Sequence, residues 1–331
     1  LLADSQDDTQ FRVLVATPEK FDLMMRQGWE EKIGRPLTLV VVDEAHTIQD
    51  KERGLRLELL LATINRECRE AQFLLLTPFI ENAREVARWL GGQNSDDISL
   101  GVDWQPNDRA IGIVSPLDAG ALNGRSRDYR LSFQTVHTSR PGICLDEDFS
   151  LGKEEALAAS LSKAKDIGTL AAMVARKLSA RGPVIAMHSR PDWVWNLAEK
   201  LKGNRCDALP DDVRFVQNYV AAELGTELPL GALLAHKAGA HHGGLPEEVR
   251  MLMEWLFEIG HLDALAATTT LAQGVNFPVS GVVMASTHYP QGKQSVPMPP
   301  EDFWNIAGRA GRVSQGQLGV VALVAKDESE V

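Results

Sequence analysis

Two groups of residues, far apart in the chain, have the side chains needed to act on a phosphate ester. The apolar run at residues 37–42 ends in Asp43-Glu44-Ala45-His46, and residues 305–312 place Arg309 and Arg312 three positions apart, each after a glycine. Adjacent carboxylates can hold Mg2+ and polarise a water molecule, whereas a pair of arginines can neutralise charge on a phosphoryl group in transfer. Together they predict a nucleoside triphosphatase whose active site is divided between two domains.

The acidic pair stands where parallel sheets bind their ligands, at the carboxyl end of a strand. Asp43 is predicted to hold Mg2+ through water, and Glu44 is predicted to orient and deprotonate the attacking water. Taken alone, these carboxylates also suit a solvated strand end or the start of a helix. The two arginines alone equally suit a glycine-rich helix end with solvated side chains.

Two further segments carry groups that can donate to phosphates. Residues 268–278, Thr-Thr-Thr-Leu-Ala-Gln-Gly-Val-Asn-Phe-Pro, come directly after an apolar run. Residues 17–20, Thr-Pro-Glu-Lys, place a proline at the first position of a predicted helix, whose backbone amides could meet a phosphate. A turn that caps a helix would also explain the first segment, and a simple helix cap the second.

A histidine pair precedes a double glycine in His241-His242-Gly243-Gly244-Leu245. A metal site with His236 is a remote interpretation, because no cysteine or acidic ligand joins at a suitable spacing. A loop beside a nucleic-acid path, or a structural turn, fits the segment better.

Apolar runs alternate with helical stretches, which is typical of an α/β fold with mostly parallel sheets. Residues 103–166 are rich in Gly, Pro, Ser and charge, and predict an irregular connector with a hairpin or edge strand at the alternating stretch 129–136. The connector would join two domains, 1–102 and 167–331. The predicted strands are 13–16, 37–43, 73–76, 98–102, 184–187, 264–267, 282–285 and 320–324, and the predicted helices are 19–26, 55–69, 82–90, 168–180, 192–201, 211–237 (broken by Pro229 and Gly231) and 246–259.

Composition limits the class of protein further. The 331 residues carry a net charge of −11 and no basic footprint, so non-specific coating of a duplex is not expected and any grip on nucleic acid must come from particular loops. The three cysteines show no metal spacing and indicate a reducing, cytoplasmic setting. No apolar run is long enough for a membrane span, and the start has no signal segment.

Taken together, these segments resemble the DEAD/DEAH-box helicases of superfamily two, and most of all their superkiller-type branch. Residues 43–46 resemble motif II, 17–20 motif Ib, and 268–278 and 305–312 motifs V and VI. Ser189-Arg190 falls where motif IV would be, and 241–245 resembles a pattern of the branch's second domain. The resemblance covers nearly the whole chain, with the motifs in the expected order.

The resemblance implies two RecA-like parallel-sheet domains with ATP and Mg2+ bound between them, and 3′-to-5′ movement along single-stranded DNA or RNA. It implies that Arg309 and Arg312 reach the nucleotide from the second domain. Its implied site residues fall into three sets: catalytic Asp43, Glu44, His46, Arg309 and Arg312; nucleotide-binding or coupling Thr77, Gln273, Gly274, Asn305 and Gly308; and nucleic-acid-binding Thr17, Pro18, Lys20, Ser189, Arg190, His242, Thr268 and Asn276.

The chain departs from the family pattern in three places. The Ser-Ala-Thr of motif III corresponds to Thr77-Pro78-Phe79, and motif VI opens with Asn305 where the family usually has Gln. A phosphate-cradling Gly-x4-Gly-Lys-Ser/Thr loop does not occur in the sequence. We therefore expect the first RecA-like domain to be incomplete at its N-terminus and the chain to be an inactive piece of a longer helicase, called the parent below, with further domains.

Two other functions remain open at this point. Phe79 in place of a hydroxyl residue suits a nucleic-acid-dependent ATPase that clamps or remodels without unwinding. The absent phosphate loop suits a non-enzymatic nucleic-acid-binding scaffold. A metal hydrolase using the histidines is remote. The sequence leaves DNA versus RNA, and the biological pathway, open.

Overall fold

The computed structural model describes two compact units, Leu1–Val102 and Asp103–Val331. The residues it describes are 13–28, 36–49, 54–77, 82–91, 108–122, 126–140, 142–143, 147–150, 166–225, 229–269, 271, 279–291, 294–311 and 318–326. Of the described helices, none combines the length and apolar character required to span a bilayer.

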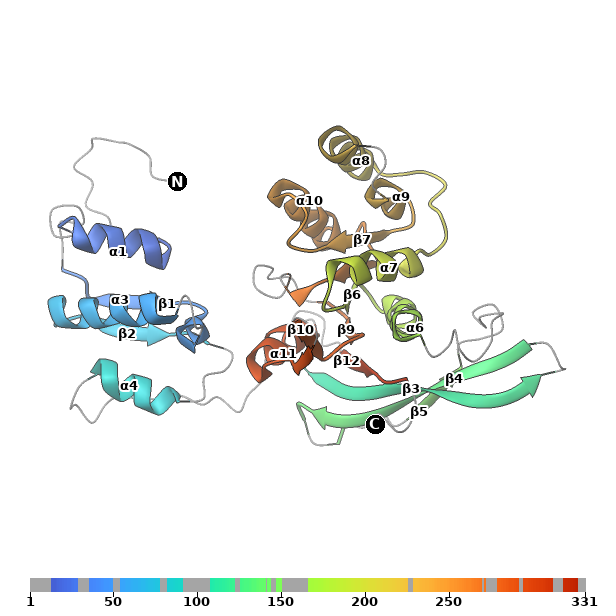
Figure 1. Ribbon diagram of the computed structural model, residues 1–331, viewed down its shortest axis with the longest axis horizontal. Coiled ribbons are helices and arrows are strands. Elements are labelled where there is room, and N and C mark those ends of the chain that lie inside the picture. The colour runs from blue at the N-terminus through green and yellow to red at the C-terminus, as the bar shows by residue number, and fades with distance from the viewer. Residues whose placement is uncertain are drawn as a thin grey trace. The chain divides into compact units, whose positions relative to one another are not determined.

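The first unit is built on two parallel strands. β1 (Leu39–Val42) pairs with β2 (Gln72–Leu75) in register from Leu39 opposite Gln72 to Val42 opposite Leu75. α3 (Gly54–Glu67) packs its buried leucines and Ile64 against the strands, and α1 (Pro18–Arg26), η1 (Ala45–Gln49) and α4 (Ala83–Gly91) complete the unit (Figure 1). This arrangement brings the ends of both strands to one edge.

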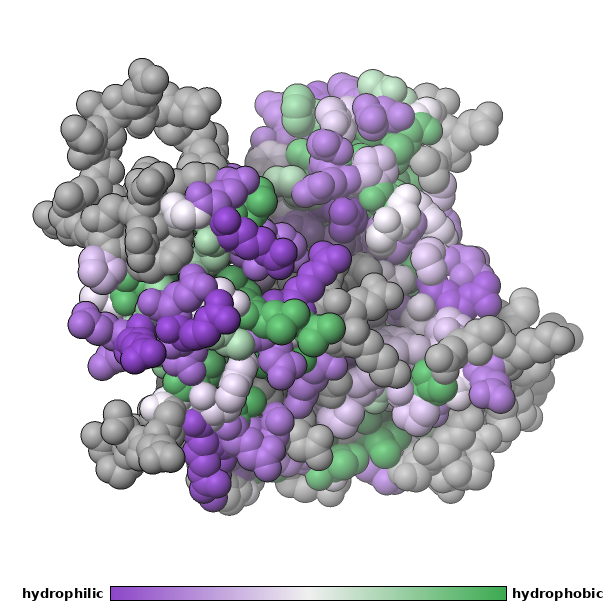
Figure 2. All heavy atoms as spheres, turned by 60° about the vertical axis from the view of Figure 1, so that its left-hand side comes forward, coloured by the Kyte–Doolittle hydropathy of each residue, from purple (hydrophilic) through white to green (hydrophobic). Residues whose placement is uncertain are grey.

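One face of this small sheet is apolar and accessible. Leu39 and Val41 on β1 and Leu74 on β2 are about half exposed, because side chains alternate between the two faces of a strand. Leu76, just past β2, is also exposed. Figure 2, in which the first unit comes forward, shows apolar side chains at the surface among polar ones.

The predicted strand at 13–16 is wrong. Val13 and Val15 have no strand partner among the described residues and are 79% and 91% exposed, so alternation of valines is not sufficient to form a strand here. The predicted strand at 98–102 lies outside the described residues. The helix predicted from residue 19 begins one residue earlier, at Pro18, whose ring fixes a φ suited to a first helical position.

The second unit contains a sheet of eight strands in the order β5-β4-β3-β12-β9-β6-β8-β7. The six neighbours from β3 to β7 in that order are parallel, and β4 is antiparallel to both β3 and β5. The α/β class with a mostly parallel sheet is thereby confirmed. The strands are β3 (Arg109–Leu122), β4 (Ser126–Thr138), β5 (Glu147–Ser150), β6 (Val184–Met187), β7 (Ala238–His241), β8 (Ala264–Ala267), β9 (Gly281–Met284) and β12 (Gly319–Val324).

Helices cover the parallel part of this sheet, and its central strands are buried throughout. β6, β8 and β9 have every residue buried, as expected for strands covered on both faces. The helices are α6 (Ile167–Ser179), α7 (Pro191–Leu201), α8 (Asp211–Leu224), α9 (Leu230–Leu234), α10 (Glu247–Glu258) and α11 (Pro300–Ala307) (Figure 1). Pro246, predicted as the first helical residue, is the residue before α10.

The stretch 103–166 contributes strands to this sheet. β3 pairs in parallel with β12 from Arg109 to Val114 and in antiparallel fashion with β4 along its length, with register shifts near Gly112 and after Asp118 (Figure 1). The alternating residues 129–136 lie in β4, whereas β3 was not predicted. Gly112, Pro116 and Asp118 depress strand propensity, and pairing on both sides overrides that preference.

Candidate nucleotide and nucleic-acid interface

The acidic pair of the first unit lies directly after β1 in a constrained turn. An Asp43 Oδ1 oxygen accepts a hydrogen bond of 2.9 Å from the backbone N–H of Glu44. Glu44 has φ +52°, a left-handed conformation that is uncommon for a residue with a side chain. Such conformations cluster at functional sites, because the surrounding structure must offset their cost. Both carboxylates are exposed.

The turn brings Thr77 beside the acidic pair. The Leu76 N–H donates to Val42 O (2.8 Å), and the Ala45 N–H donates to Leu76 O (2.9 Å), so the chain after β2 runs alongside the chain after β1. His46 Nδ1 lies 3.2 Å from Glu44 Oε2. Asp43, Glu44, His46 and Thr77 are therefore gathered at one edge of the first unit.

Thr17 acts as the N-cap of α1. Its Oγ1 accepts from the Lys20 N–H at 3.3 Å, and Pro18 occupies the first helical turn. The simple cap that was one interpretation of this segment is present. Thr17 and Lys20 are exposed.

In the second unit, three predicted contact segments meet at the carboxyl ends of neighbouring strands. The His188 N–H after β6 donates to Ala267 O of β8 (2.9 Å), and the Thr268 N–H after β8 donates to His241 O of β7 (3.1 Å). β6, β8 and β7 are adjacent and parallel, so the residues that follow them lie together at the carboxyl ends of the strands, called the carboxyl edge of the sheet. These residues are Ser189, Arg190, Thr268 and His242. Segments at least 26 positions apart in sequence thus come together at these strand ends.

Three histidines at this edge are buried. Burial lowers the pKa of His188 to about 4, and the ring Nδ1 accepts from the Ser189 N–H at 2.9 Å. Burial also lowers the pKa of His241, although its Nε2 lies 2.7 Å from Glu254 Oε1. His242 has its pKa lowered by burial and then by His241, and its Nδ1 accepts from the Gly244 N–H at 3.1 Å. Burial thus favours the neutral form of all three rings.

An aromatic residue that the sequence analysis missed lies at the same edge. Trp193, in the first turn of α7, is 40% exposed. The Arg190 guanidinium lies 4.9 Å from its ring centroid, and the His188 ring lies edge-on at 4.4 Å. Arg190 is held by two hydrogen bonds of 3.0 Å to Asp192, which keep the pKa of that carboxyl below its usual value.

The turn after α11, Gly308–Gly311, is called the arginine turn here because it contains Arg309. It lies at the amino ends of the strands, opposite the ends described above. α11 ends at Ala307, and Gly308 is its C-cap. The Val279 N–H, just before β9, donates to Arg309 O (3.0 Å), and the Gly311 N–H donates back to Val279 O (2.8 Å). A Cβ on Gly319, the first residue of β12, would overlap the backbone nitrogen of Gly311. Arg309 is thus fixed at the amino ends of β9 and β12.

Several predicted site residues lie outside the described residues: Gln273, Gly274, Asn276 and Arg312. Asn305 and Gly308 lie at the end of α11, close in sequence to Arg309. No group of three His, Cys, Asp or Glu side chains suited to a metal ion occurs in the part of the chain that the structure describes.

Comparison with known proteins places these features in a family. The family model "DEAD/DEAH box helicase" matches residues 3–86, and the model "Helicase conserved C-terminal domain" matches residues 211–314. The chain belongs to the DEAD/DEAH-box helicases. The acidic turn after β1 lies within the first match, and α8, α10 and the arginine turn lie within the second.

Relatives of this helicase chain align over almost all of it. It is 31% identical over 332 residues to the ATP-dependent DNA helicase Hel308 of Pyrobaculum calidifontis, covering 97% of this chain, and 30% identical to Hel308 of Methanocella arvoryzae, covering 99%. It is 28% identical to the Hachiman protein HamB of Bacillus cereus, covering 93%. The chain spans 40% of the length of each Hel308 relative and 27% of HamB.

Proposed function

We propose that the parent protein is an ATP-driven motor that moves along single-stranded nucleic acid, with this chain supplying much of its catalytic core. The observation that carries the proposal is the separation of two chemistries on the second unit. Hydroxyl, backbone and cationic groups at Ser189, Arg190 and Thr268 share the carboxyl edge of the sheet, whereas Arg309 lies at the amino edge. The second unit can then contact the nucleic-acid backbone at the carboxyl ends of its strands and the nucleotide at their amino ends.

The acidic turn of the first unit suits a nucleotide with Mg2+. This cation is usually bound by one or two carboxylates together with water and substrate phosphates, and Asp43 offers an exposed carboxylate of that kind. Bound Mg2+ would supply positive charge next to the phosphates. Glu44, oriented by its left-handed backbone and close to His46, would take a proton from the attacking water. Arg309 would add positive charge from the second unit.

The nucleic-acid side of the proposal uses the carboxyl edge. Ser189 and Arg190 would meet the sugar–phosphate backbone, and contacts of that kind carry no sequence information. Thr268 is only 6% exposed and remains a proposed contact at the same strand ends. His242 is only 6% exposed, so it would act through the Gly243–Gly244 turn that it helps to hold. Thr17, Pro18, Lys20 and Asn276 remain proposed contacts. Binding without strong sequence preference is therefore expected.

DNA is the first polymer to test, because the Hel308 relatives are named as DNA helicases. A clamp or remodeller that hydrolyses ATP without separating strands is the second candidate. The sequence Thr77-Pro78-Phe79 favours it, since Phe79 replaces a hydroxyl residue of the family's coupling motif.

The test is ATP hydrolysis by the parent protein with and without single-stranded DNA or RNA. Glu44→Gln should lower turnover at least about 100-fold while ATP still binds, because a general base contributes about 10²–10⁴-fold. Glu67→Gln, which changes a carboxylate at the end of α3, is the matched control and should hydrolyse normally.

Two results would contradict the proposal. Normal turnover in Glu44→Gln would remove that residue as the base. A parent that hydrolyses no ATP with either polymer would favour a binding scaffold. An unwinding assay alongside distinguishes a helicase from a clamp.

A further inference from the structure

The second unit contains a buried arginine that none of these roles uses. Arg109 is the first residue of β3 and is 7% exposed, and burial lowers the pKa of its guanidinium. Its Nε has no hydrogen-bond partner among the described residues. Burying a guanidinium with one of its donors unsatisfied is costly, so an apolar residue would serve the fold better. Residues that lower the stability of the fold in this way occur chiefly at functional sites.

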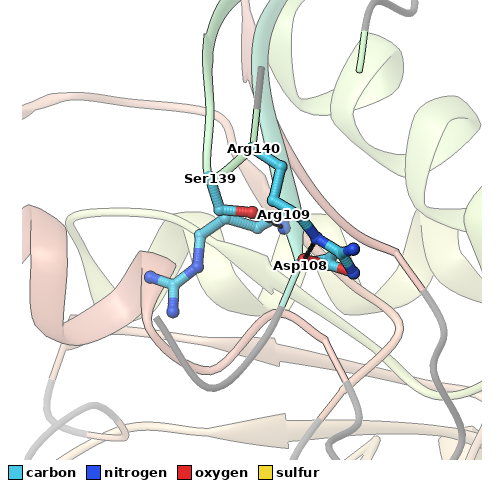
Figure 3. Close-up of polar contacts among 4 residues, drawn as sticks. All are labelled: Asp108, Arg109, Ser139 and Arg140. Carbon is cyan, nitrogen blue, oxygen red and sulfur yellow. Dashed lines mark hydrogen bonds and ion pairs between the residues drawn. The ribbon is translucent and has the colours of Figure 1, made fainter. Parts of the chain in front are cut away.

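The backbone of Arg109 is fixed on both sides. Its N–H donates to Ser139 Oγ (2.9 Å), and the Ser139 N–H donates to Arg109 O (3.0 Å). The Gly319 N–H of β12 donates to Asp108 O at 2.7 Å. The neighbouring Arg140 pairs with the Asp108 carboxylate, and Figure 3 shows the Arg109 side chain extending away from that pair. The start of β3 therefore sets the direction of the Arg109 side chain.

That direction leads to the end of α11. The position that a Cβ on Gly308 would occupy lies 4.0 Å from Arg109 Nη1, 2.9 Å from Trp304 O and 3.6 Å from Asn305 O. The guanidinium and the carbonyls of the last helical turn thus converge around Gly308. The carboxyl end of a helix carries partial negative charge, which favours a cation there. Arg309 is the next residue.

We propose that Arg109 is a positioning residue, whose charge holds the carboxyl end of α11 and thereby fixes where Arg309 points. The inference rests on the proposed function, because the direction of Arg309 matters only if it serves a phosphoryl transfer. Arg109 itself is too deeply buried to reach the nucleotide.

Arg109→Met in the parent protein tests this, because methionine removes the charge and keeps an apolar side chain of similar reach. The melting temperature should stay the same or rise, since a buried charge is lost. The kcat for ATP should fall about 100-fold, as for a 1 Å misplacement of a catalytic group, with KM for ATP changed far less. Arg109→Lys, which keeps the charge, should restore part of the turnover.

Arg140→Met is the matched control, because Arg140 lies beside the same strand end but its side chain is exposed and paired with Asp108. It should leave turnover unchanged. Hydrogen exchange gives a readout that does not depend on hydrolysis. The amides of Gly308, Arg309 and Ala310, which donate to the last carbonyls of α11, should exchange faster in Arg109→Met than in Arg140→Met.

Wild-type turnover or unchanged exchange in Arg109→Met would overturn the inference. The inference would also be overturned if Arg109→Met lowered both the melting temperature and turnover and Arg109→Lys restored neither. That result indicates a purely structural role. If the wild-type parent hydrolyses no ATP, the proposed function fails, and the exchange result alone decides whether Arg109 holds the helix end.

Discussion

At the scale of single residues, Trp193 offers a ring that can stack on a nucleobase. Arg190 lies over the ring and His188 supports it edge-on, so the indole is held in place at the sheet edge proposed to contact nucleic acid. Base–aromatic stacking tolerates any sequence, because every base has a π-face. A nucleobase that stacked on the Trp193 ring in place of the Arg190 guanidinium would leave the guanidinium able to bind a phosphate.

Trp193→Ala should therefore weaken binding of single-stranded DNA by about 1–3 kcal/mol, the range for loss of one stacked base. Fluorescence anisotropy with a labelled oligonucleotide measures this. Trp255→Ala is a closely matched control, because Trp255 on α10 is 38% exposed compared with 40% for Trp193. Equal affinities of the two variants would remove Trp193 from the interface.

The residues that sequence could identify are those whose pattern is local. Asp43 and Glu44 are adjacent and end an apolar run, and Arg309 and Arg312 follow glycines, so the sequence selects them as candidates, and their roles stay predictions. Trp193 was missed because an aromatic residue at helical spacing usually faces a core, and only the fold shows its exposure. Nothing in the sequence distinguishes Arg109 from other charged residues. Its burial is seen only in the fold, where β12 and α11 lie beside it.

At the scale of elements, the arginine turn depends on close contact with the start of β12. Gly319→Ala should destabilise the fold by about 1–3 kcal/mol, the usual cost of overpacking, because its Cβ would overlap Gly311 and the carbonyl carbon of Ala310. Gly231→Ala is the control, since Gly231 lies in α9 with open space around it and should gain about 0.5–1 kcal/mol. Urea unfolding measures both, and equal effects would contradict the close-packing argument.

Element prediction succeeded where apolar runs are continuous and buried. β6, β8 and β12 were predicted from such runs, because strands covered on both faces need apolar residues at every position. β7, Ala-Gly-Ala-His, was missed because its small residues carry almost no hydrophobic signal. β3 was missed because its glycines and proline indicate a loop, and only the neighbouring strands give it pairing partners.

At the scale of the whole molecule, the second unit should be sensitive to acid. His188, His241 and His242 are buried at one sheet edge with lowered pKa values. The unfolded chain binds protons near the ordinary value of 6.5, whereas folded His188 does so only near 4. Between these values the unfolded state holds more protons, so folding stability falls as pH falls. His188 alone should cost about 2 kcal/mol between pH 7 and pH 5.

The measurement is the melting temperature of the parent protein between pH 7 and pH 5. His188→Asn keeps an acceptor for the Ser189 N–H but does not titrate, so its melting temperature should decline less steeply than that of the wild type. The melting temperature of this variant should still decline with falling pH, because His241 and His242 are unchanged and their pKa values are also lowered. His288→Asn, at an exposed position on β10 (His288–Gln291), should keep the wild-type slope. Identical slopes for His188→Asn and wild type would show that His188 is not held neutral by burial, and that the carboxyl edge is more open to water than its packing indicates.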